Sequence, residues 1–310
     1  MNKCLYCYKE VENGDYHKKC SESFFGTKKA PLIEYSLSQM SELAKDVVER
    51  SVSVPGVQAK LSMSLLKETK NSSNNRLTVV GALGGNYIFK PPNEDYPQMP
   101  ENEHLTMRIA EAFGINVVPS SLIKLNSGEL SYITKRVDRT ETGEKIHMID
   151  MFQITEAFDK YKSSMEKIGN AINLYTSNTL LDKLLFFELT LFSFIVGNND
   201  MHLKNFSLLR TGSDWSLSPA YDLLNVSIIL PTDTDELALS LEGKRKKFKR
   251  NHFELFAERL ELTPKQITRV FNRFSKNKSK AMDLIKGSFL SNELKLKYLE
   301  TIEERYSRLY

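Results

Sequence analysis

The sequence predicts a two-lobed α+β fold in which a β-rich zone is followed by a mainly helical zone. Short β-prone runs broken by glycines fill residues 31–145, whereas long apolar or amphipathic runs with helical spacing fill residues 146–310. A third zone, residues 1–30, carries all three cysteines of the chain. Strands followed by helices are typical of an α+β architecture, and we expect a ligand-binding cleft between the two lobes.

The composition is that of an ordinary globular protein. Apolar residues make up 41% and charged residues 26% of the 310 residues, which favours a packed core over disorder. The most apolar run, residues 189–197, is about half the length that a bilayer-spanning helix needs. The first residues also lack the apolar core of a secretion signal. We therefore expect a cytoplasmic protein without a membrane partner.

The charge balance excludes a strongly basic nucleic-acid binder. The net charge of +4 is small, although it suits a protein that handles a polyanion. One basic cluster stands out, residues 244–250, in which Lys and Arg surround Phe248. Two interpretations of this cluster remain open: a solvated loop, or a site for phosphate or an acidic partner.

Residues 1–30 contain the pattern Cys4-x2-Cys7-x9-His17-x2-Cys20. Thiolate and imidazole ligands in two close pairs are able to close a tetrahedral zinc site, which stabilises segments too short to bury a core of their own. Four protein ligands leave no open position, so such a zinc ion would be structural and not catalytic. The alternative is a free-thiol extension with an incidental histidine.

The β-rich zone contains several strand candidates and one helix candidate. Glycines and the hairpin signature Asn126-Ser127-Gly128-Glu129 separate the strands. The helix candidate, residues 100–113, has apolar positions at helical spacing and ends at Gly114. The strand candidates are residues 58–65, 77–80, 87–89, 122–125 and 130–134.

The helical zone includes one helix that should be buried. The run 180–196 has apolar residues on nearly every face. Two short strand candidates, residues 207–210 and 215–217, flank a Thr211-Gly212 turn after it. Further helix candidates follow at residues 254–260, 264–274 and 292–310.

The strongest chemical signal, Gly197–Phe206, follows the buried helix directly. Asp200 and Asn205 should share a tight loop, and the hairpin after them should return Asp222 to their neighbourhood. Phosphoryl transfer needs a carboxylate that accepts the proton of the attacking hydroxyl, and oxygen ligands for Mg²⁺. We therefore predict Asp200 as catalytic base and Asn205 and Asp222 as magnesium ligands. Asp-x4-Asn alone is common by chance, and only the preceding helix and following hairpin make it specific.

Two basic side chains, Lys204 and His202, share this loop. Lys204 is predicted to offset the charge that develops on a transferred phosphate. For His202 two roles remain open, a hydrogen bond to the loop backbone or a contact with phosphate.

Upstream, two segments are candidates for phosphate binding. Lys90 ends a β-run and is either a ligand of the α- and β-phosphates or a plain surface lysine, and Glu103 on the next helix is predicted to pair with it. The run Ser53–Lys60 contains one glycine and one proline before a strand. It matches neither glycine-rich nucleotide motif, so a plain turn is the alternative.

Taken in order, these pieces resemble the HipA family of bacterial toxin-antitoxin serine/threonine kinases. The resemblance covers residues 50 to 310. The matching segments are Ser53–Lys60 (SVPGVQAK), Tyr87–Pro92 (YIFKPP), Glu101–His104 (ENEH), Lys135–Arg139 (KRVDR), Asn199–Phe206 (NDMHLKNF) and Ser218–Asp222 (SPAYD).

The resemblance implies a protein-kinase-like fold and a set of ATP- and magnesium-binding residues. Lys90 would bind the ATP phosphates, Asp200 would be the base, and Asn205 and Asp222 would hold Mg²⁺. Ser53 would be a site of autophosphorylation, as in some members, where added negative charge inhibits. The loop over the ATP phosphates would consist of Val54, Pro55, Gly56, Val57, Gln58, Ala59 and Lys60.

The resemblance also implies partners. A helix-turn-helix, HipB-like antitoxin would bind operator DNA, so contact with DNA would be indirect, and the substrate would be a protein, as aminoacyl-tRNA synthetases are for relatives. Full-length members carry a β-rich subdomain ahead of the position of Ser53, where this chain has the Cys/His segment. Members that lack this subdomain can obtain it from a separate small protein, so the resemblance also implies such a partner.

One departure limits the resemblance. Lys135 stands where some members have an acidic residue, and that contact is not carried over. Two rival hypotheses remain: a catalytically inactive co-repressor scaffold for the DNA-binding partner, and a kinase for small molecules.

Overall fold

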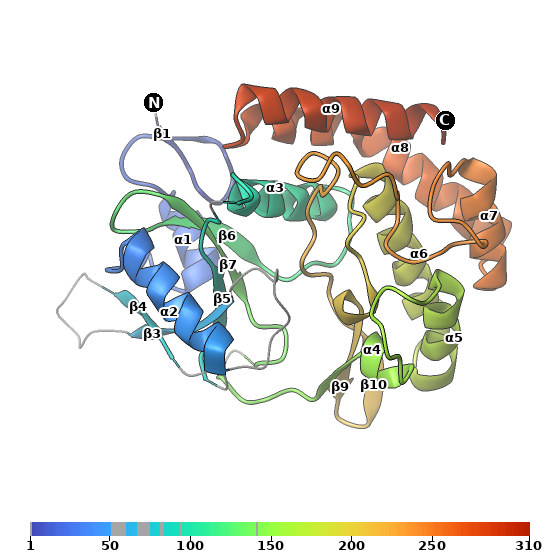
Figure 1. Cartoon of the computed structure of the whole chain (residues 1–310), viewed down its shortest axis with the longest axis horizontal. Helices are drawn as coiled ribbons and strands as arrows, with labels where there is room; N and C mark the ends of the chain where they lie inside the picture. Colours follow the sequence, from blue (N-terminus) through green and yellow to red (C-terminus); the bar gives the residue numbers. More distant parts are fainter. Residues whose placement is uncertain (1, 51–59, 67–74, 81–83, 94, 141) are drawn as a thin grey trace. The chain divides into compact units, whose positions relative to one another are not determined.

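The computed structural model describes residues 2–50, 60–66, 75–80, 84–93, 95–140 and 142–310 (Figure 1). The chain divides into two compact units. Unit 1 comprises residues 1–104, 118–144 and 287–289, and unit 2 comprises residues 105–117, 145–286 and 290–310. Strands dominate the first unit and helices the second, which confirms the predicted α+β class.

Unit 1 is built on an antiparallel sheet with the strand order β4-β3-β5-β7-β6. The predicted hairpin is present, because Lys124 pairs with Leu130 and Gly128 turns the chain with a φ of 105°. The strands are β3 (Leu61–Leu66), β4 (Arg76–Val79), β5 (Tyr87–Lys90), β6 (Ser120–Lys124) and β7 (Leu130–Lys135).

Three helices and a small hairpin accompany this sheet, and the last of the helices belongs to unit 1 only as far as His104. They are α1 (Lys18–Phe25), α2 (Leu37–Arg50), α3 (Met99–Ala112), β1 (Asn2–Lys3) and β2 (Glu10–Val11). The prediction of a single helix within residues 31–145 is wrong, because α2 is a second one. Its residues Leu37, Met40 and Leu43 recur every three positions and pack on the sheet core, and this stripe stabilises the helix.

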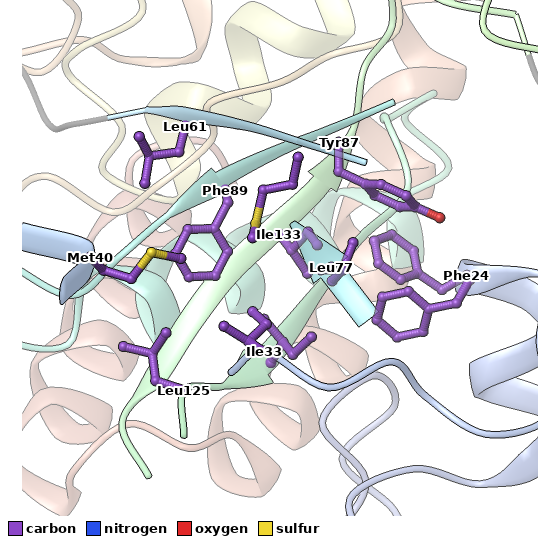
Figure 2. Close-up of a cluster of buried hydrophobic side chains, with 12 residues drawn as sticks. Phe24, Ile33, Met40, Leu61, Leu77, Tyr87, Phe89, Leu125 and Ile133 are labelled. Atoms are coloured by element: carbon purple, nitrogen blue, oxygen red, sulfur yellow. The ribbon is translucent and has the colours of Figure 1, made fainter. Parts of the chain in front are cut away.

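The core of unit 1 collects side chains from the sheet and from both preceding helices (Figure 2). Met40 of α2 is fully buried there, as is Phe89 of β5. Phe24 of α1 packs with its ring centre 5.8 Å from that of Tyr87. The Cys/His segment thus contributes aromatic side chains to the same core as the strands.

Unit 2 is organised around α6 (Thr179–Ile195), whose aromatic and aliphatic side chains are mostly buried, as predicted. Phe186 packs on Phe256, and Phe187 packs on Phe271, at 5.8 and 6.3 Å between ring centres. The surrounding helices are α4 (Met151–Ile154), α5 (Met165–Tyr175), α7 (Arg250–Arg259), α8 (Pro264–Gly287) and α9 (Asn292–Ser307).

Helix α8 runs well past the predicted end at residue 274. Asn277, Ala281 and Ile285 continue its buried stripe at four-residue intervals, so tertiary packing extends the helix through a polar, lysine-rich stretch. Within the described ranges, no helix is both long and apolar enough to cross a bilayer.

A three-stranded antiparallel sheet of unit 2 includes the strand that directly follows the loop Gly197–Phe206. Its order is β10-β9-β8, from β8 (Met148–Asp150), β9 (Ser207–Thr211) and β10 (Asp214–Leu217). The predicted turn at Gly212 is present, with Thr211 paired to Asp214. A single 3₁₀ turn, η1 (Leu203–Asn205), precedes β9.

Candidate functional site

The loop after α6 begins at Gly197, which has a φ of 71°. A Cβ atom at this position would lie 2.8 Å from both Asn225 Oδ1 and Ser227 Oγ. The carbonyl oxygen of Gly197 accepts hydrogen bonds from the backbone of Val226 and Ser227, at 3.0 and 3.2 Å. Only glycine therefore fits where the buried helix gives way to the loop.

The loop closes on the backbone carbonyl of Asp200. This oxygen accepts a hydrogen bond from the His202 backbone at 2.8 Å and one from Asn205 Nδ2 at 2.9 Å. Because the amide nitrogen of Asn205 is used in this way, its Oδ1 is the atom left for a cation, and amide oxygens are suitable ligands for Mg²⁺. The predicted proximity of Asp200 and Asn205 is thus present.

Tyr161 is a contact that the sequence analysis missed. Its hydroxyl donates to Asp200 Oδ1 at 2.7 Å, and its ring meets the imidazole of His202 edge-on at 5.1 Å between centres. Burial raises the pKa of Tyr161 well above its usual value, and the hydrogen bond to Asp200 raises it further, so the group stays a donor. Tyr161 lies 39 residues from Asp200 on an irregular segment, without a local sequence signal.

His202 is buried beside two carboxylates. Burial lowers its pKa below the usual value, while the charges of Asp200 and Asp222 oppose the shift. Its Nδ1 atom makes no hydrogen bond to any described residue. A neutral imidazole is therefore expected at neutral pH, and a role of Nδ1 in bonding the loop backbone is not seen.

Asp222 returns to this neighbourhood through the β9–β10 hairpin. The Ser218 backbone nitrogen donates to the Ser207 carbonyl at 2.9 Å, one residue beyond the last paired position of the strands. Asp222 has a φ of 56°, an uncommon conformation for a residue with a side chain. Its charge acts on the pKa of both His202 and Tyr221, so unit 2 gathers two acids around one imidazole.

Lys204 is exposed and turned toward α4. Its Nζ lies 4.8 Å from the centre of the Phe152 ring. Burial raises the pKa of nearby Asp150, and the charge of Lys204 opposes this shift. The predicted contact of Lys204 with a transferred phosphate stays a prediction.

In unit 1, the predicted Lys90–Glu103 ion pair is present. Lys90 Nζ lies 2.6 Å from Glu103 Oε1, and both side chains are almost completely buried. The Tyr132 ring lies against the ammonium group at 5.3 Å. Removing one member of a buried ion pair costs about 3–5 kcal/mol, so each group helps the other to remain charged.

A second charged cluster of unit 1 lies in the segment Lys135–Arg139. Arg136 grips Asp138 with two parallel hydrogen bonds of 2.8 Å, and Arg139 adds a third at 2.6 Å. Burial alone would raise the pKa of Asp138, but the two guanidinium groups hold it below the usual value. Arg136 also donates to Ser62 Oγ of β3 at 3.1 Å, which ties the end of β7 to the strand after the candidate phosphate loop.

The remaining predicted residues divide into two groups. Ser53 and the segment Val54–Ala59 lie outside the described residues, and Lys60 is exposed just before β3. The basic cluster, residues 244–250, is a loop in which exposed lysines flank a fully buried Phe248. Phe248 packs on Phe194 of α6, so an apolar anchor holds this cluster in place.

Comparison with known proteins decides the family. The family model described as the HipA-like C-terminal domain matches residues 52–282, which is most of the chain. This chain belongs to the HipA-like family. The matched residues include the candidate phosphate loop, the Lys90–Glu103 pair and the whole loop around Asp200.

Several curated proteins are similar to this HipA-like chain. It is 32% identical over 193 residues to a "Putative kinase" of Haemophilus influenzae, covering 58% of the chain and 54% of the relative. It is 33% identical over 234 residues to a "Putative kinase" of Sinorhizobium fredii, covering 69% and 55%. It is 25% identical over 213 residues to the serine/threonine-protein kinase toxin HipA of Shewanella oneidensis, covering 62% and 47%. The chain spans about half the length of these relatives.

Two solved structures share the fold of the HipA-like chain. A chain of the Shewanella oneidensis MR-1 complex of HipA, HipB and operator DNA superposes with a TM-score of 0.68 and 18% identity, covering 90% of this chain and 71% of that chain. The Helicobacter pylori proinflammatory kinase CtkA superposes with a TM-score of 0.54 and 16% identity, covering 80% and 93%. The predicted kinase-like fold is therefore confirmed.

Proposed function

We propose that this HipA-like chain is an ATP- and Mg²⁺-dependent serine/threonine protein kinase. The observation that carries the proposal is the loop of unit 2, in which Asn205 binds the Asp200 backbone and Asp222 shares the electrostatic environment of His202. Kinase-named relatives and the shared fold support the same reaction class.

The donor set fits magnesium. Asn205 offers an amide oxygen and Asp222 a carboxylate, and hard oxygen ligands are those that Mg²⁺ prefers. When bound, the ion would neutralise charge on the β- and γ-phosphates and orient them. The imidazole of His202, which burial keeps neutral, adds no positive charge to compete with the cation.

Asp200 is proposed as the base that accepts the proton of the substrate hydroxyl. The hydrogen bond from Tyr161 occupies one carboxylate oxygen and fixes the orientation of the group. A carboxylate accepts several hydrogen bonds, so a second oxygen lone pair remains for the incoming hydroxyl. Tyr161 is thus a positioning residue for Asp200.

The proposed phosphate contacts come from unit 1 and from the loop. Lys90, oriented by Glu103, would bind the α- and β-phosphates, as lysine–glutamate pairs do in protein kinases. Lys204 is proposed to meet the γ-phosphate, and the loop Val54–Lys60 to cover the phosphates. Ser53 is the proposed autophosphorylation site.

The similarity to the HipA–HipB–DNA complex supports one proposed partner, a helix-turn-helix antitoxin that mediates contact with DNA. The other two proposed partners rest on the family resemblance of the sequence: a protein substrate of the aminoacyl-tRNA synthetase type, and a small protein that supplies a β-rich subdomain. A protein of this kind would act as the toxin of its pair.

The decisive experiment is phosphate transfer from labelled ATP with Mg²⁺. The full chain should label itself or a protein in a bacterial lysate, and Asp200→Asn should abolish the label. Asp214→Asn, an exposed acid at the start of β10, is the matched control and should label like the wild type. Equal absence of label in wild type and Asp200→Asn would remove the enzymatic proposal and favour a scaffold, whereas transfer only to a small molecule would change the substrate class.

A further inference from the structure

Cys4, Cys7, His17 and Cys20 come together at one point of unit 1, although two elements separate them. Their ligand atoms all lie within 4.8 Å of one another. His17 Nδ1 is 3.4 Å from Cys7 Sγ and 3.7 Å from Cys20 Sγ. Sulfur and nitrogen ligands on a tetrahedral zinc ion are separated by about 3.6 Å, so the two contacts of His17 Nδ1 already have the spacing of a zinc coordination shell.

The imidazole is held in the correct orientation for a metal. His17 Nε2 donates to the backbone carbonyl of Glu10 in β2, at 2.8 Å. This bond fixes the proton on Nε2 and leaves the Nδ1 lone pair facing Cys7 and Cys20. A hydrogen bond of this kind behind a ligating histidine is the usual support of a zinc site.

The backbone around the first two cysteines is folded into a tight turn. Cys4 N donates to the Lys9 carbonyl at 2.8 Å, and Tyr8 N donates to the Cys4 carbonyl at 3.0 Å. Tyr8 has a φ of 66°, which costs about 1 kcal/mol or more in a residue with a side chain. A strained turn that directs Cys4 and Cys7 to the same point needs a compensating interaction, and a bound cation provides one.

We propose that Cys4, Cys7, His17 and Cys20 bind one structural zinc ion, and that this zinc clip fastens residues 2–26 to the rest of unit 1. Four protein ligands leave no position for substrate, so the role is structural. Thiolates with imidazole favour zinc over the hard cations that the catalytic loop would take.

The zinc clip is attached to the rest of unit 1 on two sides. On one side, α1 begins between His17 and Cys20 and delivers Phe24 and Phe25 to the core. On the other side, the Tyr8 hydroxyl hydrogen-bonds His104 Nδ1 of α3 at 2.8 Å, in a buried position.

His104 is the neighbour of Glu103, the partner of Lys90. The zinc clip therefore braces the turn of α3 that holds the Lys90–Glu103 pair. The consequence for nucleotide binding rests on the proposed function, but the metal site itself does not.

The first test is metal analysis of the full chain, purified without added metal or chelator. We expect about one zinc per chain, because four ligands close one site. His17→Asn and Cys20→Ser should lose at least half of it. His147→Asn, an exposed histidine of unit 2, should keep it. Less than half an equivalent in folded wild type, or iron in place of zinc, would overturn the proposal.

The second test uses the wild-type chain, so that it does not depend on a variant folding. Cobalt exchanged for zinc should give the intense visible absorption of a tetrahedral cobalt–thiolate site, and added zinc should remove it. A weak octahedral spectrum would contradict the four-ligand geometry.

The third test separates the zinc clip from its attachment to α3. Tyr8→Phe should keep its zinc but lower the thermal midpoint by about 2–4 °C, the loss expected for one buried hydrogen bond. A thermal midpoint of Tyr8→Phe equal to that of the wild type would contradict the proposed attachment of the zinc clip to α3. Failure of kinase activity with zinc retained would concern the proposed function alone, because metal content and melting are measured without ATP.

Discussion

The Lys90–Glu103 pair of unit 1 and the Asp200 loop of unit 2 hold charged side chains in contrasting settings. The pair is almost completely buried, and each charge has a side-chain partner at 2.6 Å. Asp200 is only partly buried, backbone groups and the Tyr161 hydroxyl hold it, and no ion pair joins it to a cation among the described residues. At the first site the charges of Lys90 and Glu103 neutralise each other. At the second site the charge of Asp200 is not neutralised by an ion pair with a described side chain. The comparison predicts that changes at the pair reduce stability, and that changes at the loop reduce activity.

The largest effect should come from Asp200→Asn. Loss of a general base reduces turnover by about 10²–10⁴-fold. Relief of repulsion between neighbouring acids should leave the thermal midpoint unchanged or raised. Turnover with labelled ATP and a thermal melt measure the two quantities. A large drop in the midpoint would break the comparison, because Asp200 would then be a structural residue.

Glu103→Gln should destabilise the protein by about 3–5 kcal/mol, because it removes the carboxylate that pairs with the buried Lys90 ammonium group. Denaturant unfolding gives the free energy directly. The control is Glu111→Gln at the end of the same helix, where the glutamate is half-exposed and pairs with Arg108. That change should cost under about 1 kcal/mol. Equal losses for both variants would contradict the special role of burial.

Gly197→Ala should cost about 2–4 kcal/mol, because the new Cβ meets Asn225 and Ser227 in addition to adopting a strained φ. Gly212→Ala is the matched control, since its φ of 63° is similar but nothing lies within 4 Å of the added atom. It should cost only about 1 kcal/mol. The difference between the two variants measures how rigidly the start of the loop is packed in unit 2. Equal losses of stability would mean that the turn at Gly197 can shift to accommodate the added Cβ atom.

Glu101, in the first turn of α3, should make stability depend on pH. Burial raises the pKa of Glu101 to about 7, from 4.5 for a glutamate side chain exposed to water. Between these values the folded chain binds more protons than the unfolded chain, so this contribution to stability falls as pH rises. Glu101→Gln should reduce the loss between about pH 5 and pH 8 by on the order of 2 kcal/mol. Exposed Glu144→Gln should leave the pH profile unchanged.

Tyr161→Phe should have the smallest effect, a fall in turnover of about fivefold to tenfold, because Asp200 loses one orienting hydrogen bond at a partly exposed site. Its thermal midpoint should stay close to that of the wild type. Tyr175→Phe, an exposed tyrosine at the end of α5, should change neither quantity. A Tyr161→Phe variant with full turnover would show that the loop backbone alone positions Asp200.

Much of the site could be predicted because its parts are local in sequence or strongly patterned. Asp200 and Asn205 are five residues apart, and the hairpin that returns Asp222 has a turn signal at Gly212. The apolar run of α6 predicts a buried helix, because it has apolar residues on nearly every face. The Lys90–Glu103 pair joins neighbouring elements, which are usually adjacent in space.

The contacts that sequence could not give are long-range and involve single residues. Tyr161 reaches Asp200 across 39 residues, and Tyr8 reaches His104 across 96. No periodicity encodes such pairs, because they depend on how separate elements pack. Helix α2 was missed because its apolar stripe is narrow, and α8 was cut short because its second half is polar in composition. In both cases tertiary packing outweighs local preference.

All three cysteines of the sequence lie in one cluster with His17, so thiol chemistry is confined to one site. A thiol-directed dye would have no other sulfhydryl of this sequence to modify. The amount of dye bound would therefore measure the fraction of protein molecules in which the Cys/His cluster has opened. Peroxide or an electrophile would react at the same site, which is distant in sequence from the residues proposed to bind phosphate. A sensor of oxidative damage would thus be present in the protein without any added label.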